Sequence, residues 1–324
     1  MDDELAAAIV PFAEALGADP GDVAWVPNVT FGLNLIARSL MGRLEPGDEV
    51  LLTDLEYGSQ LMLWHWVCER SGAVLRLAPI AGTPPHEIAD VIVGCASPAT
   101  RVALVSHVTS ASAQRLPVED VGRRLRERGV VVVVDGAHAP GQIDLDLPSV
   151  GCDYYAGNLH KWFGTARSAG VLYAPGAEAQ RGLDPLVVGW GGTDRAEPIA
   201  RRVHLPGTVD PSVYLSAPTG LSFHREVLTP ARPAARERLA AAAGALERRG
   251  WARVGDHQDD LLMAAFQPPA GVDPDRLEAA LEAARVEAIV TAGAGGRLLR
   301  ICVAWYTTDE DIDRLLDVVR AVAR

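Results

Sequence analysis

Lys161 is the one lysine among the 30 lysine and arginine residues of a 324-residue chain. A chain this rich in arginine, alanine, glycine and proline is typical of a GC-rich genome, in which lysines that serve only as surface charges drift to arginine. Arginine cannot replace an amine that must attack a carbonyl carbon, because the guanidinium stays protonated and is not nucleophilic. Lys161 is therefore predicted to form a Schiff base, and a chance leftover lysine is the alternative.

A carboxylate and two histidines are expected close to Lys161. Asp135 follows the run of five valines at 130–134, His107 ends an earlier apolar run, and His160 directly precedes the lysine. Ligands in open α/β sheets bind at the carboxyl ends of the strands, so these side chains should share one site. An aldehyde cofactor such as pyridoxal 5'-phosphate (PLP) needs a carboxylate at its ring nitrogen, because the protonated ring is the electron sink. Asp135 suits that role, and an aspartate that caps a turn is the alternative.

The elements that position these residues alternate between strands and helices up to about residue 175, which is typical of βαβ units on a mainly parallel sheet. Helical periodicity fits residues 32–41, 60–71 and 118–128. The fold class is therefore α/β, with a mostly parallel, seven-stranded large domain. The seven predicted strands cover residues 23–27, 49–53, 74–77, 102–107, 130–135, 154–157 and 170–173.

The rest of the chain predicts a smaller α+β unit. A helical pattern rich in alanine and arginine runs from about residue 211 to 249 and links the two units. Beyond it, strands are predicted at 260–266 and 298–304, and helices at 273–285 and 308–323. The predicted parts are a short N-terminal helical segment (1–22), a PLP-binding large domain (23–225), and the linking helix with a C-terminal small domain (226–324).

Composition excludes several classes of function. A net charge of −12 and a pI near 5.1 oppose nucleic-acid binding. No apolar run reaches the roughly 18 residues of a membrane span, and the acidic start lacks the basic region of a signal peptide, so the cytoplasm is expected. The four cysteines lack CxxC spacing, which argues against both a disulfide framework and a metal site.

Two segments, VVDGAHAPGQ and GNLHKW, resemble the class V aminotransferase family of fold-type I PLP enzymes. The resemblance spans nearly the whole chain and is greatest to the branch of isopenicillin N epimerase-like proteins and carbon–sulfur lyases. It implies the aspartate aminotransferase-like fold, with PLP held by Lys161. By position it also implies that Asp135 pairs with the ring nitrogen, that His138 approaches the ring O3' or the substrate, and that Asn158 and His160 lie near the phosphate.

Three further segments resemble the same family. WVPNVTFGLNL resembles its phosphate turn, in which the start of a helix binds an anion, here at Asn28, Val29 and Thr30; a capped helix is the alternative. In DLEYGSQ, Tyr57 has the position of an aromatic ring over the cofactor, and simple packing is the alternative. LPGTVDPSVYLSAP resembles the segment whose threonine, here Thr208, reaches the phosphate in the neighbouring subunit, which implies a homodimer with shared active sites.

The segment RLLRICVAWYTTDEDIDRL resembles the terminal strand and helix of the family. The resemblance implies that Arg300 binds the α-carboxylate of the substrate, for which a planar fork of donors is suited. Arg297 is a nearby rival for this role.

Departures from the family pattern bear on the reaction. Cysteine desulfurases and selenocysteine lyases carry a nucleophilic cysteine on a loop before the arginine strand, where this chain reads AIVTAGAGGRLL. Cys302 lies beyond Arg300 in the strand itself, which disfavours persulfide chemistry. Ser110 has the position at which desulfurases commonly hold an asparagine over the cofactor, which also disfavours desulfurase chemistry. Only about 27 residues precede the phosphate turn, so we expect either a truncated product or a reduced N-terminal arm.

Together these residues predict a homodimeric PLP enzyme that labilises a bond at Cα of an amino acid. Lys161, Asp135 and His138 are the predicted catalytic residues, with Lys161 also the proton-transfer base. Epimerisation or β-elimination of the carbon–sulfur lyase type is preferred over the alternative, transamination with a 2-oxo acid. A non-catalytic PLP-binding partner subunit is the alternative from another class, and the intact set of Lys161, Asp135 and Arg300 opposes it. No GxGxxG or GxxxxGK[ST] motif follows a predicted strand, which disfavours a nucleotide-binding module.

Overall fold

The computed structural model describes residues 2–204, 207–255, 258, 260–293 and 295–323. Its centre is a seven-stranded sheet in the order β1-β7-β6-β5-β4-β2-β3. β7 runs antiparallel to both of its neighbours, and the other strand pairs are parallel. The predicted α/β class with a mostly parallel, seven-stranded sheet is confirmed. The strands are β1 (Val23–Val26), β2 (Glu49–Thr53), β3 (Val74–Ala78), β4 (Thr100–Ser106), β5 (Val131–Gly136), β6 (Tyr154–Asn158) and β7 (Gly170–Tyr173).

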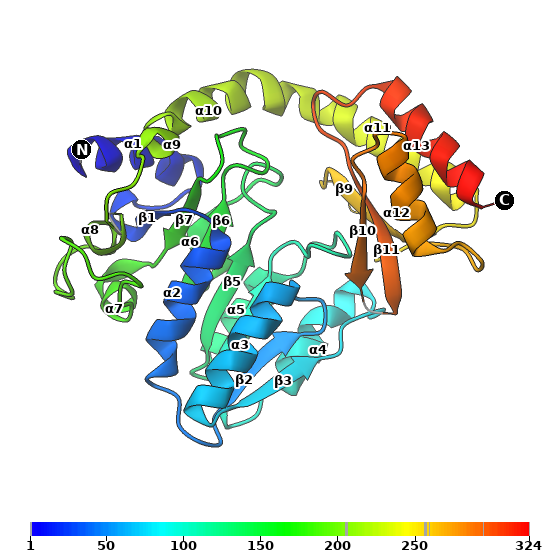
Figure 1. Cartoon of the computed structure of the whole chain (residues 1–324). Helices are drawn as coiled ribbons and strands as arrows, with labels where there is room; N and C mark the ends of the chain where they lie inside the picture. Colours follow the sequence, from blue (N-terminus) through cyan, green and yellow to red (C-terminus); the bar gives the residue numbers. More distant parts are fainter. Residues whose placement is uncertain (1, 205–206, 256–257, 259, 294, 324) are drawn as a thin grey trace.

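Helices cover both faces of this sheet (Figure 1), which explains why strands such as β5 are almost continuously apolar. Successive valines of β5 point to opposite faces of the sheet. Val133 packs in one hydrophobic core, and Val132 and Val134 pack in the other. On the first face pack α2 (Val29–Met41) and α3 (Gly58–Ser71). On the second pack α1 (Asp2–Ala15), α4 (Ile88–Cys95), α5 (Val118–Arg126) and α6 (Leu147–Val150).

A second, four-stranded antiparallel sheet has the order β10-β11-β9-β8. Residues of α11, α12 and α13 form its hydrophobic core. The predicted strands 260–266 and 298–304 are present with shifted ends, and β8 and β10 were not predicted because one has two residues and the other is partly exposed. The elements are β8 (Ala252–Arg253), β9 (Met263–Gln267), α12 (Pro274–Ala283), β10 (Ile289–Gly293), β11 (Gly296–Cys302) and α13 (Asp309–Val322).

A nearly continuous helical path leads from the large sheet to the second sheet and arches over the top of the molecule in Figure 1. It consists of α9 (Ser212–Leu215), α10 (Ala217–Phe223), a π-helical turn (His224–Leu228) and α11 (Thr229–Glu247). Two short helices, α7 (Gly176–Arg181) and α8 (Ile199–Val203), and two 3-10 turns (Pro20–Asp22 and Pro85–Glu87) complete the elements. We place the proposed boundary between the 23–225 and 226–324 units within this path. No helix in the described part of the chain has the length and apolar character needed to cross a membrane.

Candidate active site

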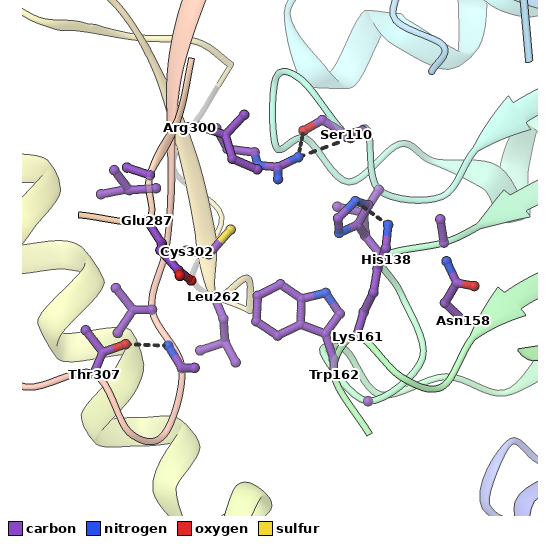
Figure 2. Close-up of a pocket in the computed structure, with 18 of the residues that line it drawn as sticks. Ser110, His138, Asn158, Lys161, Trp162, Leu262, Glu287, Arg300, Cys302 and Thr307 are labelled. Atoms are coloured by element: carbon purple, nitrogen blue, oxygen red, sulfur yellow. Dashed lines mark hydrogen bonds between the residues drawn. The ribbon is translucent and has the colours of Figure 1, made fainter. Parts of the chain in front are cut away.

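A cavity of about 1310 Å³ opens between the carboxyl ends of the parallel strands and the second sheet. Asn158 of β6 lies on one wall, and Arg300 and Cys302 of β11 lie on the facing wall (Figure 2). Asp135, at the end of the neighbouring strand β5, also lines the cavity. Thr208 is in an exposed loop and does not line the cavity of its own chain. His107, which was expected to share the site with Lys161, does not line the cavity either, because it is buried with its Nδ1 3.2 Å from the Tyr155 hydroxyl. The other site residues predicted from the sequence do line it: Asn28, Val29, Thr30, Tyr57, Ser110, Asp135, His138, Asn158, His160, Lys161 and Arg300.

Lys161 follows β6 and points into this cavity (Figure 2). Its Nζ lies 2.9 Å from Nε2 of His138. Burial lowers the pKa of Lys161 to about 8, since desolvation disfavours the ammonium form, and the carboxylate of Asp135 opposes this shift. An amine with this pKa is partly unprotonated near neutral pH, so Lys161 can act as a nucleophile or a base.

Asp135 lies at the carboxyl end of β5 and is only 3% exposed. Burial raises the pKa of its carboxyl to about 6, against the lowering effects of the Ala137 N–H and of Lys161. The Ala137 N–H donates to Oδ1 over 2.9 Å. The carboxyl is therefore mostly ionised at neutral pH, and a buried carboxylate favours a cationic partner such as a protonated ring nitrogen.

His138 connects the lysine to the second sheet. Its Nδ1 is buried without a hydrogen-bond partner. Burial, together with Lys161 and Arg300, lowers the pKa of His138 well below its ordinary value, so the ring is neutral. The His138 carbonyl accepts a hydrogen bond from Nε2 of Gln142 (2.6 Å), and Oε1 of Gln142 accepts one from the Leu262 N–H (2.8 Å). Gln142 therefore joins the turn after β5 to the second sheet.

The start of α2 faces the same cavity. Asn28 caps the helix, because its Oδ1 accepts a hydrogen bond from the Phe31 N–H over 2.9 Å. The Val29 N–H, predicted to meet a phosphate, donates to Oδ1 of Asn158 over 3.1 Å. Asn158 is thereby held at the helix start, where the helix dipole favours an anion. Thr30, one residue further along, also lines the cavity.

His160 and Tyr57, which were also predicted, line the cavity as well. Nδ1 of His160 lies 2.9 Å from the Ala169 carbonyl, so this nitrogen carries the proton and donates. Burial is the largest cause of a lowered pKa at His160. Tyr57 stands just before α3, and its side chain is half-exposed at the cavity.

Of the two arginines considered for the substrate carboxylate, Arg300 lines the cavity and Arg297 does not. Nη1 of Arg300 donates to the carbonyl of Ser110 over 2.7 Å and contacts its hydroxyl at 3.1 Å. Nε of Arg300 is buried and has no hydrogen-bond partner. Arg297 is instead paired with Asp275 and Glu278 on α12. The fork of Arg300 is therefore oriented from one side and retains an unpaired donor for a carboxylate.

Three residues that were not predicted also matter. Gln60, in the first turn of α3, is 1% exposed, lines the cavity and has an Oε1 without a hydrogen-bond partner. Trp162 lines the cavity next to Lys161 with its Nε1 also unpartnered. Cys302 lines the wall opposite Lys161. Of these three, only Cys302 could have been found from the sequence. Side chains two positions apart in a strand share a face, and Arg300 was already predicted to face the substrate.

A second buried carboxyl supports the end of β4. Glu56 accepts hydrogen bonds from the Thr53 hydroxyl (2.8 Å), the Ser106 N–H (3.0 Å) and the Ser106 hydroxyl (2.5 Å). Burial raises the pKa of Glu56 to about 7 against these bonds, and the charge of Asp135 contributes in the same direction as burial. Ser106 lines the cavity and pairs with Asp135 in the sheet, so Glu56 helps to fix the floor of the site.

These groups fit PLP. The cavity combines an amine of lowered pKa, a buried carboxylate and a helix start suited to an anion. The unpartnered Nδ1 of His138 and Nε of Arg300 would each be left unsatisfied unless a polar ligand were bound.

Comparisons with known proteins agree with this fit. The family model for aminotransferase class-V matches residues 5–201. Isopenicillin N epimerase of Streptomyces clavuligerus is 37% identical over 96% of this chain and 82% of its own. A probable cysteine desulfurase of Mycolicibacterium paratuberculosis is 30% identical over 96% of this chain and 48% of its own. Among solved structures, a mutant of C-DES with glycine covalently linked to its PLP cofactor has a TM-score of 0.84 and 25% identity, over 98% of this chain and 84% of that one.

Proposed function

Because this chain belongs to the class V aminotransferase family of PLP enzymes, we propose that it inverts the configuration at Cα of an amino acid, as an epimerase similar to isopenicillin N epimerase. The observation that carries the proposal is the placement of Lys161 and Arg300 on facing walls of one cavity. An amino acid held there by its carboxylate would present Cα to the amine. The match along most of both chains favours epimerisation over other reactions at Cα.

The residues that would hold the cofactor follow from the geometry. PLP, when bound, supplies an electron sink that weakens the bonds at Cα. Lys161 would hold it covalently, and the buried carboxylate of Asp135 would pair with its ring nitrogen. The unpartnered Nδ1 of His138 would meet the ring oxygen or the substrate. The phosphate would lie at the start of α2, near Asn28, Val29, Thr30, Asn158 and His160, with Tyr57 over the ring.

The same chain would bind and deprotonate the substrate. Nε and the free edge of the Arg300 guanidinium would accept the α-carboxylate, while Ser110 keeps the fork in place. Lys161, whose amine is free once the substrate is attached, would take the proton from Cα. Its lowered pKa suits a base that works near neutral pH.

Carbon–sulfur bond cleavage is the second candidate. The cysteine desulfurase relative favours it, and removal of the Cα proton by Lys161 would also precede β-elimination. The segment between β10 and β11 contains no cysteine in the sequence, so we do not propose a persulfide route through that loop. Transamination has no better support than these two reactions.

We also propose that the protein is a homodimer with shared sites. Trp190 is fully exposed, and Val188, Met62 and Val209 are large apolar residues that are also exposed. Exposed apolar side chains of this size are typical of an interface. Thr208, next to Val209, would reach the phosphate in the partner's cavity. We propose the cytoplasm as the location, since none of the four cysteines is disulfide-bonded, as in a reducing compartment.

A panel of substrates tests the proposed reaction. Purified protein loaded with PLP is incubated with isopenicillin N, common L-amino acids and cysteine conjugates, and the products are separated by chiral chromatography. We expect the antipode of at least one substrate. Formation of pyruvate and ammonia without an antipode would favour the lyase, and formation of a new amino acid from an added 2-oxo acid would favour transamination.

A further inference from the structure

Cys302 is placed differently from the other cysteines of the chain. It ends β11 two positions after Arg300, so both side chains lie on the same face of the strand. Cys68 and Cys152 are buried, and Cys95 packs against the core of the large sheet. Cys302 alone among the four opens into the cavity. Figure 2 shows its sulfur on the wall that faces Lys161 and His138.

The surroundings of the thiol suit a proton donor. Burial raises the pKa of Cys302, while the neighbouring Arg300 guanidinium and Lys161 lower it to a smaller extent. The group therefore keeps its proton at neutral pH. Arg300 is close enough to stabilise the thiolate that would remain after the proton leaves, because a cation next to sulfur favours the charged form. The thiol and the Lys161 amine line the same cavity from facing walls, so the two groups share one site.

Inversion requires that the proton leave one face of Cα and arrive on the other, which two proton-transfer groups on opposite faces can achieve. A base that returns the proton from its own side regenerates the starting isomer, whereas a donor on the opposite side gives inversion. His138 cannot supply the second face, because it lies on the wall of Lys161 and contacts its Nζ. Cys302 and the exposed Glu287 lie on the facing wall, and the exposed Tyr306 and Asp311 also line the cavity. Of these groups, Cys302 follows the carboxylate-binding Arg300 by two positions on the same face of β11, and Arg300 would hold Cα near it.

We propose that Cys302 is the second proton-transfer residue of this site and that it protonates Cα on the face opposite Lys161. The inference depends on the proposed epimerase function. The C–H bond at Cα breaks and its proton goes to the Lys161 amine, which becomes an ammonium. The S–H bond of Cys302 breaks and its proton forms the new C–H bond, which leaves a thiolate beside Arg300. Solvent then protonates the thiolate and deprotonates the ammonium, and the reverse reaction exchanges the two roles.

Alkylation tests the thiol without turnover. Cofactor-free protein is treated with iodoacetamide, and the modified cysteines are mapped by peptide mass spectrometry. Cys302 is expected to react before Cys68 and Cys152, because it opens into the cavity. Arg300→Gln should slow its alkylation about 10-fold, which corresponds to a rise of about one unit in the thiol pKa. If Cys302 reacts only after unfolding, the thiol is closed to substrate and the inference is wrong.

Isotope exchange tests the role in the reaction. The holoenzyme is incubated in D₂O with isopenicillin N and the amino-acid panel, and both isomers are analysed for deuterium at Cα. Cys302→Ala should still exchange deuterium into the starting isomer, because Lys161 acts alone on its face. Formation of the antipode should fall about 100-fold or more, the usual contribution of a positioned acid. Cys95→Ala, which removes a thiol outside the cavity, should behave as the wild type.

The remaining outcomes separate the inference from the proposed function. Normal inversion in Cys302→Ala would overturn the inference alone, and Glu287→Gln and Tyr57→Phe, run in parallel, would identify the group that replaces it. Loss of exchange as well as inversion would also overturn it, since that indicates damage to binding. A persulfide on Cys302 after treatment with L-cysteine would show a nucleophile instead of a proton donor. A wild-type enzyme that yields no antipode from any probe would overturn both the inference and the proposed epimerisation.

Discussion

At the scale of single residues, burial acts with opposite results on the amine and the carboxyl of the site. Desolvation disfavours whichever form is charged. It lowers the pKa of Lys161 to about 8 and raises that of Asp135 to about 6. Each group also stabilises the charged form of the other, which limits both shifts. The cavity therefore holds a reactive amine beside a carboxylate that remains ionised at neutral pH.

We expect the covalent link to the cofactor to depend on Lys161 alone. Treatment of the PLP-loaded protein with borohydride should fix the cofactor on this residue, because no other side chain in the sequence carries a primary amine and arginine forms no such bond. Lys161→Ala and Lys161→Arg should both lose the linkage, although the second keeps the positive charge. The measurement is peptide mass spectrometry after reduction. A modified peptide in either variant would contradict the assignment.

The pH dependence of that linkage should report the lowered pKa of Lys161. Only the unprotonated amine attacks PLP, so the initial rate should rise about 10-fold per pH unit and level off above about pH 8. A lysine with the ordinary pKa of 10.5 would show no plateau below pH 10. Asp135→Asn removes a charge that raises the pKa of Lys161, so its plateau should begin at lower pH. A plateau moved to higher pH in that variant would be inconsistent with the charge interaction.

Asp135 should matter for turnover more than for folding. Asp135→Asn keeps the shape of the side chain but removes the negative charge that would keep the ring nitrogen protonated. Catalysis should slow by orders of magnitude, while the urea midpoint changes little. Asp153→Asn is the matched control, since Asp153 accepts a hydrogen bond from the Val132 N–H and does not line the cavity. Near-normal turnover in Asp135→Asn would identify a turn residue only.

At the scale of elements, the turn after β5 is one of the contacts between the two sheets. This turn contains His138, and Gln142 follows four residues later. Both the amide nitrogen and the amide oxygen of Gln142 form hydrogen bonds. One group bonds the His138 carbonyl, and the other bonds the Leu262 N–H just before β9. A single fully buried side chain therefore joins the backbone at His138 to the backbone that leads into β9.

Loss of Gln142 should destabilise the chain and loosen the site. Gln142→Ala leaves the His138 carbonyl and the Leu262 N–H unpaired, which costs about 1–3 kcal/mol for each buried group. We expect the free energy of unfolding in urea to fall by about 2–6 kcal/mol. Gln267→Ala, at an exposed position of β9, should change it by less than about 0.5 kcal/mol. Equal effects of the two substitutions would show that the connection contributes little.

At the scale of the whole molecule, the site is a space between two units and not a feature of either one. The large sheet supplies the amine, the carboxylate and the helix start, and the second sheet supplies Arg300 and Cys302. Trp190 and Thr208 lie outside the cavity in exposed positions. A second copy of the chain would cover the exposed apolar residues and could bring Thr208 to the site.

Subunit mixing tests whether the site is shared. Lys161→Ala removes the amine, and Thr208→Trp blocks the phosphate site of the partner. Each variant should be inactive as a homodimer, because each substitution inactivates both sites. In a mixed dimer with C2 symmetry, both lesions fall in one site and the other is wild type, so about a quarter of all sites should recover after random exchange. Leu215→Trp, also at an exposed position, is the control and should keep its activity. No recovery despite demonstrated exchange would mean that each site is built within one chain.

The sequence by itself determined the class of fold and most members of the site. Buried parallel strands form apolar runs in the sequence because both of their faces are covered. All seven strands of the large sheet were predicted within about two residues of their observed ends. Lys161 and Asp135 were predicted from residue type and position, and Arg300 from the resemblance to the family; all three line the cavity. The strands β8 and β10 were missed, since short or partly exposed strands have weak patterns.

Only the tertiary structure decided which distant groups meet. Ser110 and Arg300 are 190 positions apart in the sequence, and nothing local predicts that the serine orients the guanidinium. The same is true of Gln142 and Leu262, and of the thiol of Cys302 across from Lys161. The shifted pKa values of Lys161 and Asp135 also depend on burial, which the packing of two sheets creates. Residue type determines what chemistry a group can do, and the fold determines its neighbours, its solvation and therefore its protonation.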